Sequence, residues 1–441
     1  MAALYSHTTR STGTTLTALI YNADHQNHID NGVPAQLDDY STNASQMQSE
    51  TSPGTSGSES LATSLAGELE RLRYVLRQMN GGAYWYDTSG RGGIGKNAII
   101  NGDMEIAQRG TSFAAIANGA YSLDRWIYVK VGATVHTITQ DTDVPTVAQA
   151  GRLFTHSLKL ALTTPDTAIA AGDYCLLQHR IEGYNWRALA QRIITLSFWI
   201  KSPITGIHCA SLRNAGVDRS CVKEFTVNVV NTWEKKTLTF PASPSAGTWD
   251  YTTGVGAYLS IALAAGSTFQ GTANSWQSSD INSTANQVNG VNTGITPYFI
   301  TGVQLEAGSV ATEFEGRQFE QELALCQRYY WKTFKYETTP TQTAGVDTGD
   351  IDTAITVAGA ALNHFTGIRH PVVMRATPTI VTYNVGAANA EARNVTDGAD
   401  CSSTTPANIT DKGIGRITYT GNAGGTINDL VSIHLTASAE L

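Results

Sequence analysis

Ile194-Thr-Leu-Ser-Phe-Trp-Ile200 alternates apolar and polar side chains with a period of two. Because a strand points successive side chains to opposite faces, this pattern predicts a strand with one buried face. The apolar face carries Ile194, Leu196, Phe198 and Ile200, and the other face carries Thr195, Ser197 and Trp199. The same alternation recurs over residues 225–229 and 259–263, as is typical of antiparallel sheets with one solvated face.

Further strands are predicted on both sides of this stretch, separated by turn residues. They are Ile99–Asn101, Asp124–Val131, Ser157–Leu162, Tyr174–Ile181, Lys235–Phe240 and Tyr298–Glu306. About ten strands in roughly two hundred residues, without helices between them, predict a β-sandwich or jelly roll.

The C-terminal part of the chain predicts a second β-rich domain. A short helix over 319–328 and an aromatic strand over 329–336 are expected to form a hinge between the domains. Alternation then returns at 379–385, 413–419 and 430–436, which predicts a second, smaller β-sandwich.

The N-terminal part has a different, helical pattern. Short helices are predicted over 14–31 and 59–80. The second carries an apolar stripe with coiled-coil spacing, made of Leu65, Leu69, Leu72, Leu76 and Met79. The stripe fits an oligomerisation seam, and it fits equally well an amphipathic helix packed on its own domain.

The expected fold class is therefore mainly β, with two antiparallel sandwiches behind a short helical N-terminal region. Four segments follow: a helical attachment and oligomerisation region (1–88), the jelly roll (89–316), a linker helix and strand (317–335) and the C-terminal tip domain (336–441). More than one core is expected, since single cores rarely grow beyond roughly 250–300 residues.

Composition excludes several classes of partner. The formal net charge is −8, from 37 acidic and 29 basic residues, and no segment concentrates Lys or Arg as nucleic-acid binding requires. No export signal or bilayer-spanning stretch is seen, so folding in a cytoplasm is expected. The five cysteines lack CxxC spacing, which favours buried reduced thiols over a zinc site or a disulfide framework.

Several motifs together carry a family resemblance. They are Asn97–Gly110, Leu123-Asp-Arg-Trp126, Phe198-Trp-Ile-Lys-Ser202, Thr232-Trp233 and Gly302–Gly316. The set resembles the opening, inner and closing strands of the jelly-roll domain of bacteriophage tail fibres, which is similar to the carbohydrate-binding modules of secreted glycosidases.

The resemblance implies a homotrimeric tail-fibre protein of the virion, synthesised in the host cytoplasm. Its N-terminal region would attach to phage tail or baseplate proteins, and its C-terminal domain would face the host. The implied function is attachment to the host cell through a surface glycan or an outer-membrane receptor. Three weak sites on one shaft would raise avidity by roughly 10² to 10⁴.

Two loop regions combine the aromatic and polar side chains that sugar rings require. The first contains Trp249, Tyr251 and Trp276, the last of these in the long loop 271–294. The alternative for these residues is packing over a sheet edge. The second is the polar loop 384–412, with Asn389, Arg393 and Asp397, which would lie at the tip of the molecule if the C-terminus is distal.

Other candidates have more ordinary interpretations. The resemblance places Trp126, Trp199 and Trp233 in the core. Asp103, Glu105 and Glu306 would form a structural calcium site if they converged, or would otherwise be surface carboxylates. His25 and His28 would line a metal site in a trimer, or would otherwise be solvated histidines on a helix.

No catalytic motif of the easily recognised classes is present, and we expect neither an enzyme nor a cofactor. Two alternatives stay open because a pair of carboxylates is all that a glycosidase needs. One is a polysaccharide depolymerase tailspike, which would usually show the repeats of a β-helix. The other is a purely structural tail or baseplate protein.

Overall fold

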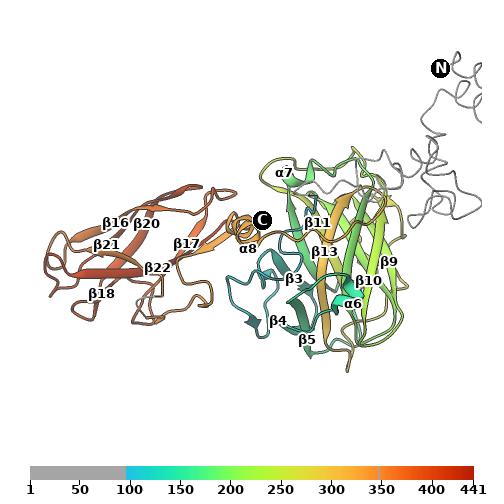
Figure 1. The fold of residues 1–441 in the computed structure, drawn as a ribbon, viewed down its shortest axis with the longest axis horizontal. Coiled ribbons are helices and arrows are strands. Elements are labelled where there is room, and N and C mark those ends of the chain that lie inside the picture. Colours follow the sequence, from blue (N-terminus) through green and yellow to red (C-terminus); the bar gives the residue numbers. More distant parts are fainter. Residues whose placement is uncertain (1–95, 346–347) are drawn as a thin grey trace, which may run out of the picture. The chain divides into compact units, whose positions relative to one another are not determined.

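The computed structural model describes residues 96–345 and 348–441 (Figure 1). The predicted helical region, its apolar stripe from Leu65 to Met79, and His25 and His28 lie outside the described residues. Within the described part of the chain, no helix is both long and apolar enough to cross a membrane.

Residues 96–316 form a jelly roll of two antiparallel sheets, as the alternation predicts (Figure 1). In spatial order the first sheet contains β1 (Ser112–Phe113), β4 (Val135–Asp141), β5 (Ser157–Thr164), β13 (Tyr298–Ala307), β7 (Ile194–Lys201) and β10 (Trp233–Phe240). The second contains β12 (Trp276–Gln277), β9 (Ser220–Val227), β8 (Gly206–Asn214), β11 (Val255–Ala265), β6 (Tyr174–Glu182), β3 (Trp126–Val131) and β2 (Ala120–Tyr121). The predicted fold class is confirmed for the described residues.

The core of the jelly roll lies between these sheets, and β7 shows how the sequence builds it. Leu196 and Phe198 are fully buried in this core, as their alternation predicts, and Trp126 joins them from β3. Trp199 and Trp233 are also buried, but in a separate cluster on the other face of the first sheet.

The segment that includes the short helix α6 (Val147–Ala150) packs against this second aromatic cluster. Asp143 lies in the chain segment just before α6. Its carboxylate accepts hydrogen bonds from the Trp233 indole N–H at 2.9 Å and from the Lys201 ammonium at 2.6 Å. Trp199 and Trp233 are therefore buried, as expected, but they lie outside the main core between the two sheets. A local loop, rather than the facing sheet, supplies their apolar neighbours.

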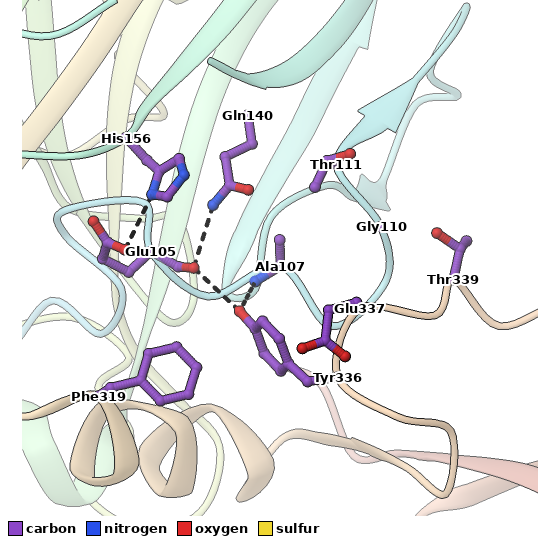
Figure 2. Close-up of a pocket in the computed structure, with 10 residues that line it drawn as sticks. All are labelled: Glu105, Ala107, Gly110, Thr111, Gln140, His156, Phe319, Tyr336, Glu337 and Thr339. Carbon is purple, nitrogen blue, oxygen red and sulfur yellow. Dashed lines mark hydrogen bonds and ion pairs between the residues drawn. The ribbon is translucent and has the colours of Figure 1, made fainter. Parts of the chain in front are cut away.

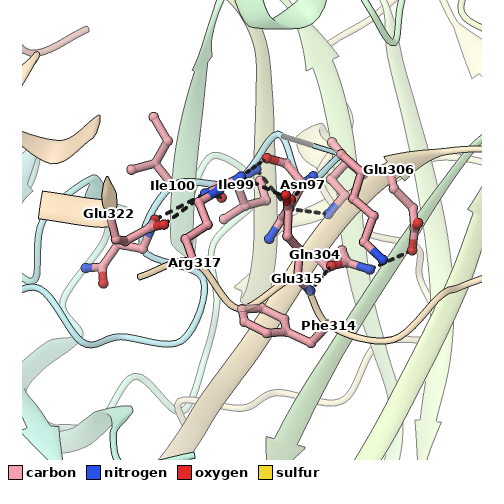
Figure 3. Close-up of polar contacts among 12 residues, drawn as sticks. Asn97, Ile99, Ile100, Gln304, Glu306, Phe314, Glu315, Arg317 and Glu322 are labelled. Carbon is pink, nitrogen blue, oxygen red and sulfur yellow. Dashed lines mark hydrogen bonds and ion pairs between the residues drawn. The ribbon is translucent and has the colours of Figure 1, made fainter. Parts of the chain in front are cut away.

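The opening and closing segments of the jelly roll meet along β13 (Figure 3). The backbone N–H of Ala98 donates to the Leu305 carbonyl at 3.0 Å, and Asn97 Oδ1 accepts from the Leu305 N–H at 3.0 Å. Arg317 then bridges the Ile99 carbonyl at 3.2 Å and the Glu322 carboxylate at 3.0 Å. These bonds hold together segments that are about two hundred residues apart in the chain.

Ile99–Asn101 was predicted as a strand and is not one, so that prediction is wrong. Asn101 has a positive φ of 59°, which ends strand pairing at this residue. Its side-chain amide donates to the carbonyls of Ile106 and Asp124 at 2.8 and 3.0 Å. These bonds hold Asn101 in a turn and tie it to the segments around Ile106 and Asp124.

The C-terminal sandwich is built around β22 (Leu430–Ser438), which pairs with four strands. They are β14 (Tyr330–Lys332), β15 (Ile351–Ala354), β17 (Thr379–Tyr383) and β18 (Arg393–Asn394), and β19 (Ala399–Asp400) extends the sheet beyond β18. A second sheet contains β16 (Leu362–Arg369), β21 (Gly413–Thr420) and β20 (Ser402–Thr410). The prediction of one loop over 384–412 is wrong, because β18, β19 and β20 lie within it.

The predicted hinge is a packed segment. Its helix α8 (Phe319–Gln327) is followed by Arg328 and Tyr329, which contact the Glu182 carboxylate at 2.6 Å each. Tyr329 is fully buried, and the Arg125 guanidinium lies 3.6 Å from the centre of its ring. These contacts join the segment to β3 and β6 of the jelly roll.

Glu440 makes a further buried contact with the jelly roll. Its carboxylate pairs with Arg109 at 2.9 Å and with Arg125, and its side chain is only 8% exposed. Burial alone would lower the pKa of Arg109, but the Glu440 and Asp124 carboxylates outweigh it and raise that pKa. Both guanidinium groups therefore stay charged and need this carboxylate.

The five cysteines are all buried and free, as expected. Burial raises the pKa of the Cys175 thiol to about 12 and that of Cys209 to about 11, so neither is a reactive thiolate at neutral pH.

Candidate functional site

Three tryptophans form a cluster at one end of the jelly roll. Trp186, at the end of the short helix α7 (Gly183–Trp186), is fully buried. The ring of Trp249 stacks on it with centroids 5.5 Å apart and planes 6° apart, and Trp276 meets Trp249 edge-on at 5.8 Å. Trp249 and Trp276 are half-buried, so the structure brings two of the sequence-predicted residues into one aromatic surface.

Backbone hydrogen bonds fix the orientation of both half-buried rings. The Trp249 indole N–H donates to the Ala246 carbonyl at 3.1 Å, and that of Trp276 donates to the Pro241 carbonyl at 3.0 Å. Because the indoles are already oriented, a ligand that stacks on them would not have to order them first.

Carboxylates hold the loop that carries Trp249. Asp218 accepts from the Thr248 backbone at 3.1 Å and from its hydroxyl at 3.0 Å. Asp250 accepts from the Thr252 N–H at 2.6 Å. Asp250 also packs against Gly183, where a side-chain Cβ would lie only 2.6 Å from Asp250 Oδ1. These acidic groups position the loop from both sides of Trp249.

Sequence reasoning missed two aromatic residues of α7: Trp186, which is buried beneath Trp249, and the exposed Tyr184. Tyr184 is 45% exposed, its backbone N–H donates to the Thr252 carbonyl at 2.8 Å, and the Arg187 guanidinium lies 4.9 Å from its ring centre. Tyr251 is half-buried and packs on the main core beside them. No local pattern singles out Tyr184 or Trp186, because α7 is a single turn between strands.

The alternative that these aromatic residues pack over a sheet edge is partly right for Trp276. Trp276 lies in β12, paired with Cys221 of β9, and it contacts the main core. Farther along the same loop, Ile281 packs on Leu176 and Val222 on the outer face of the second sheet. The long loop is thus anchored to the sandwich, and it leaves Trp276 partly exposed.

The second predicted region holds polar side chains that bind one another. The Asp400 carboxylate accepts from Asn389 at 2.9 Å and from Arg393 at 2.6 Å. Burial alone would raise the pKa of Asp400, but hydrogen bonds from Asn389, Asn384 and Arg393 keep it below its usual range. Asn389 and Arg393 therefore stabilise their own loop through Asp400. Their role in ligand binding stays a prediction.

Asp397 belongs to a neighbouring set. Its carboxylate accepts from Asn422 at 2.8 Å and from Asn394 at 3.2 Å. Asn394 also donates to Asp429 at 2.9 Å, so the three predicted residues divide between two hydrogen-bonded groups.

The proposed calcium ligands do not converge. Within 96–345 and 348–441, no group of three acidic, histidine or cysteine side chains is placed to hold a metal ion. Glu306 accepts from Thr312 and Gln304, whereas Glu105 contacts His156 at 3.0 Å. Burial, together with Glu322 and Glu105, raises the pKa of Asp103 to about 6. The alternative of a shared calcium site is therefore not supported within the described residues, and the alternative of surface carboxylates is wrong for Glu306, which is buried.

Comparison with known proteins gave matches only among solved structures. No family model matches the chain. No curated protein matches it.

Carbohydrate-binding proteins and a phage tailspike are among the matched structures. A putative sugar-binding protein of Bacteroides thetaiotaomicron is 12% identical, with a TM-score of 0.29, over 48% of this chain and all of that chain. A family 11 carbohydrate-binding module of Clostridium thermocellum is 10% identical, with a TM-score of 0.26, over 46% of this chain and 99% of that chain.

The enzymatically active domain of bacteriophage CBA120 tailspike protein 4 is 18% identical, with a TM-score of 0.26. That match covers 44% of this chain and spans about a fifth of the tailspike chain, at 21%. At these identities and TM-scores, none of the matches carries information on function.

Proposed function

We propose that this protein is a non-enzymatic tail-fibre component of a phage virion that attaches to a host-surface glycan through the aromatic surface of Tyr184, Trp249, Tyr251 and Trp276. The motifs that resemble tail-fibre jelly rolls support the assignment to a phage tail fibre. The arrangement of the rings supports the ligand class, because sugars present apolar C–H faces that stack on indole and phenol rings.

The single observation that carries the proposal is the stack of Trp249 on Trp186. A fully buried indole supports the inner face of Trp249, and the Ala246 carbonyl fixes its edge. A ring held in this way at the protein surface offers stacking area without the cost of ordering a mobile side chain.

Binding of the full-length protein to purified host polysaccharide tests the proposal. We expect Trp276→Ala to weaken binding about tenfold, equivalent to about 1.4 kcal/mol. Trp276→Phe should retain most of the binding because it keeps an aromatic ring. Trp331→Phe is the matched control, since Trp331 is half-buried in the C-terminal sandwich. Equal binding by the Trp276→Ala and unmodified proteins would refute the proposal.

The same polysaccharide distinguishes the alternative functions. Binding without release of reducing sugar supports attachment, whereas release of reducing sugar would identify a depolymerase. Failure to bind or to compete with virion adsorption would favour a structural role. Sedimentation of the full chain tests the proposed trimer separately.

A further inference from the structure

A pocket of about 320 Å³ lies between the opening segment of the jelly roll and the segment that follows β14 (Figure 2). Its volume is at the small end of the range for ligand sites, roughly 300–1,000 Å³. It is formed by residues distinct from the tryptophan cluster.

Two aromatic rings form one wall of this pocket. Phe319 and Tyr336 meet edge-on with centroids 5.3 Å apart, and Phe319 is 45% exposed. The Tyr336 hydroxyl donates to the Glu105 carbonyl at 3.1 Å and accepts from the Ala107 N–H at 3.0 Å (Figure 2). Tyr336 is therefore fixed, while Phe319 presents an open ring to a ligand.

Hydrogen-bond acceptors face the same space. Gln140 donates through Nε2 to the carbonyls of Met104 and Glu105 at 2.6 and 3.2 Å. Among the described residues, neither Gln140 Oε1 nor the exposed Glu337 carboxylate has a hydrogen-bond partner. Both are suited to accept from hydroxyl or ammonium groups of a ligand.

The pocket has an acidic lining. Glu105 and Glu337 line it together with His156, whose Nδ1 lies 3.0 Å from the Glu105 carboxylate, and no lysine or arginine is among the lining residues. A nearby cation, the Lys332 ammonium, lies outside the lining, 5.8 Å from the centre of the Tyr336 ring, and donates to the Tyr336 and Thr338 carbonyls at 2.7 Å each. The two lining carboxylates and the aromatic faces therefore favour an ammonium group over an anion.

We infer that this pocket is a second ligand site and that it takes a single amino sugar residue. The ring hydroxyls would meet Gln140, the apolar sugar face would lie on Phe319, and the ammonium group would pair with Glu337. The inference rests on the proposed function only for the source of the sugar, a polysaccharide of the host surface.

Calorimetric titration of the full chain with three matched sugars tests this inference. Glucosamine, N-acetylglucosamine and glucuronic acid share a six-membered ring and differ in charge. Just below neutral pH, where the amine of glucosamine is charged, we expect glucosamine to bind about tenfold more tightly than either of the other two.

Two exposed positions allow variants that leave the fold intact. Glu337→Gln and Phe319→Ala should each weaken glucosamine binding about tenfold. Glu320→Gln removes a carboxylate from an exposed position on α8 outside the pocket and should leave binding unchanged.

The two proposals fail in different ways. Equal binding of the three sugars, no binding of glucosamine, or full binding by Glu337→Gln would overturn the inference of an amino-sugar site. Glucosamine binding that persists in Trp276→Ala would support an independent pocket, even if the polysaccharide experiment refuted the role of the aromatic surface.

Discussion

The jelly roll has a much larger apolar core than the C-terminal sandwich, although both sandwiches also bury amides and hydroxyls. Trp126 and Phe198 are fully buried in the first, and Asn384, Asn394 and Ser432 are fully buried in the second. Apolar burial tolerates small shifts of the backbone, but a buried amide is stabilising only while its partners are in place. The C-terminal sandwich should therefore depend more on its loops.

The largest expected effect on stability comes from replacing one buried phenylalanine in each apolar core by alanine. Phe198 and Phe365 are buried rings in edge or tilted contact with Phe225 and Tyr419, at 5.2 and 5.3 Å. We expect Phe198→Ala to lower the free energy of unfolding by about 4 kcal/mol and Phe365→Ala by about 3 kcal/mol, because the smaller sandwich can close around its void. Denaturant unfolding measures both, and the reverse order would contradict the comparison.

The contact between the two sandwiches should rank next. Glu440→Gln removes the charge that faces Arg109 and Arg125 and leaves two guanidinium groups poorly compensated. We expect a loss of about 3 kcal/mol, since breaking a buried ion pair is costly.

Glu313→Gln, at an exposed position, is the control for this change. Unfolding followed by tryptophan fluorescence and by circular dichroism should separate into two transitions in Glu440→Gln. A loss below about 0.5 kcal/mol would mean that the contact contributes little.

A smaller effect should follow from removing one buried amide. Asn384 donates to Asn389 and Asp400 at 2.8 and 3.0 Å and accepts from the Gly386 N–H at 2.8 Å. Asn384→Ala should cost about 2 kcal/mol, because it leaves these groups without partners. Hydrogen exchange should increase over 384–400 and stay unchanged in the jelly roll. The exposed Asn185→Ala is the control, and equal exchange in both variants would show that the network is dispensable.

The smallest effect is a gain of stability in the jelly roll. Folding raises the pKa of Asp103 from 3.8 to about 6, mainly by burial and then by Glu322 and Glu105. The folded state thus binds the Asp103 proton more tightly than the unfolded chain does. Ionisation of Asp103 therefore lowers the free energy of unfolding as the pH rises from 4 to 6, and the full loss is present above pH 6.

Asp103→Asn should therefore raise the free energy of unfolding by about 1 kcal/mol at pH 7 and leave it unchanged near pH 4. Denaturant unfolding at the two pH values checks this sign, with the exposed Glu320→Gln as control. A gain that is equal at both values would mean that the ionisation of Asp103 is not its source.

Strands with clear alternation were predictable from the sequence. β7, β13 and β22 lie where strands were expected, and α8 lies where a helix was expected. The expectation that β7 has only one buried face is wrong, because Thr195, Ser197 and Trp199 on its other face are buried as well. Five strands of the jelly roll were missed: the two-residue strands β1, β2 and β12, and the longer strands β4 and β8.

Two of the missed strands, β8 and β20, lack alternation for a physical reason. In β8, seven of the nine residues are buried, including His208 and Arg213, because the long loop packs on the outer face of its sheet. In β20, Ser, Thr and Asn dominate an edge strand that borders only β21, so there was no apolar face to detect. Neither strand shows the period-two pattern from which strands are predicted.

The proposed binding surfaces were only partly predictable. Trp249 and Trp276 were chosen because aromatic rings in polar loops have few local partners, and the structure places them together. The pocket joins Glu105 and Tyr336, which are more than two hundred residues apart, so no local pattern indicates it. Contacts of this kind depend on how the chain returns on itself.

The position of β22 at the centre of its sheet also bears on synthesis by the ribosome. Four strands of the C-terminal sandwich pair with this one strand, which is made after all of them. Until residue 438 emerges from the exit tunnel, those strands have no central partner and keep open edges. β13 has the same place in the jelly roll, between β5 and β7, so each nascent sandwich waits for its last strand before it can close.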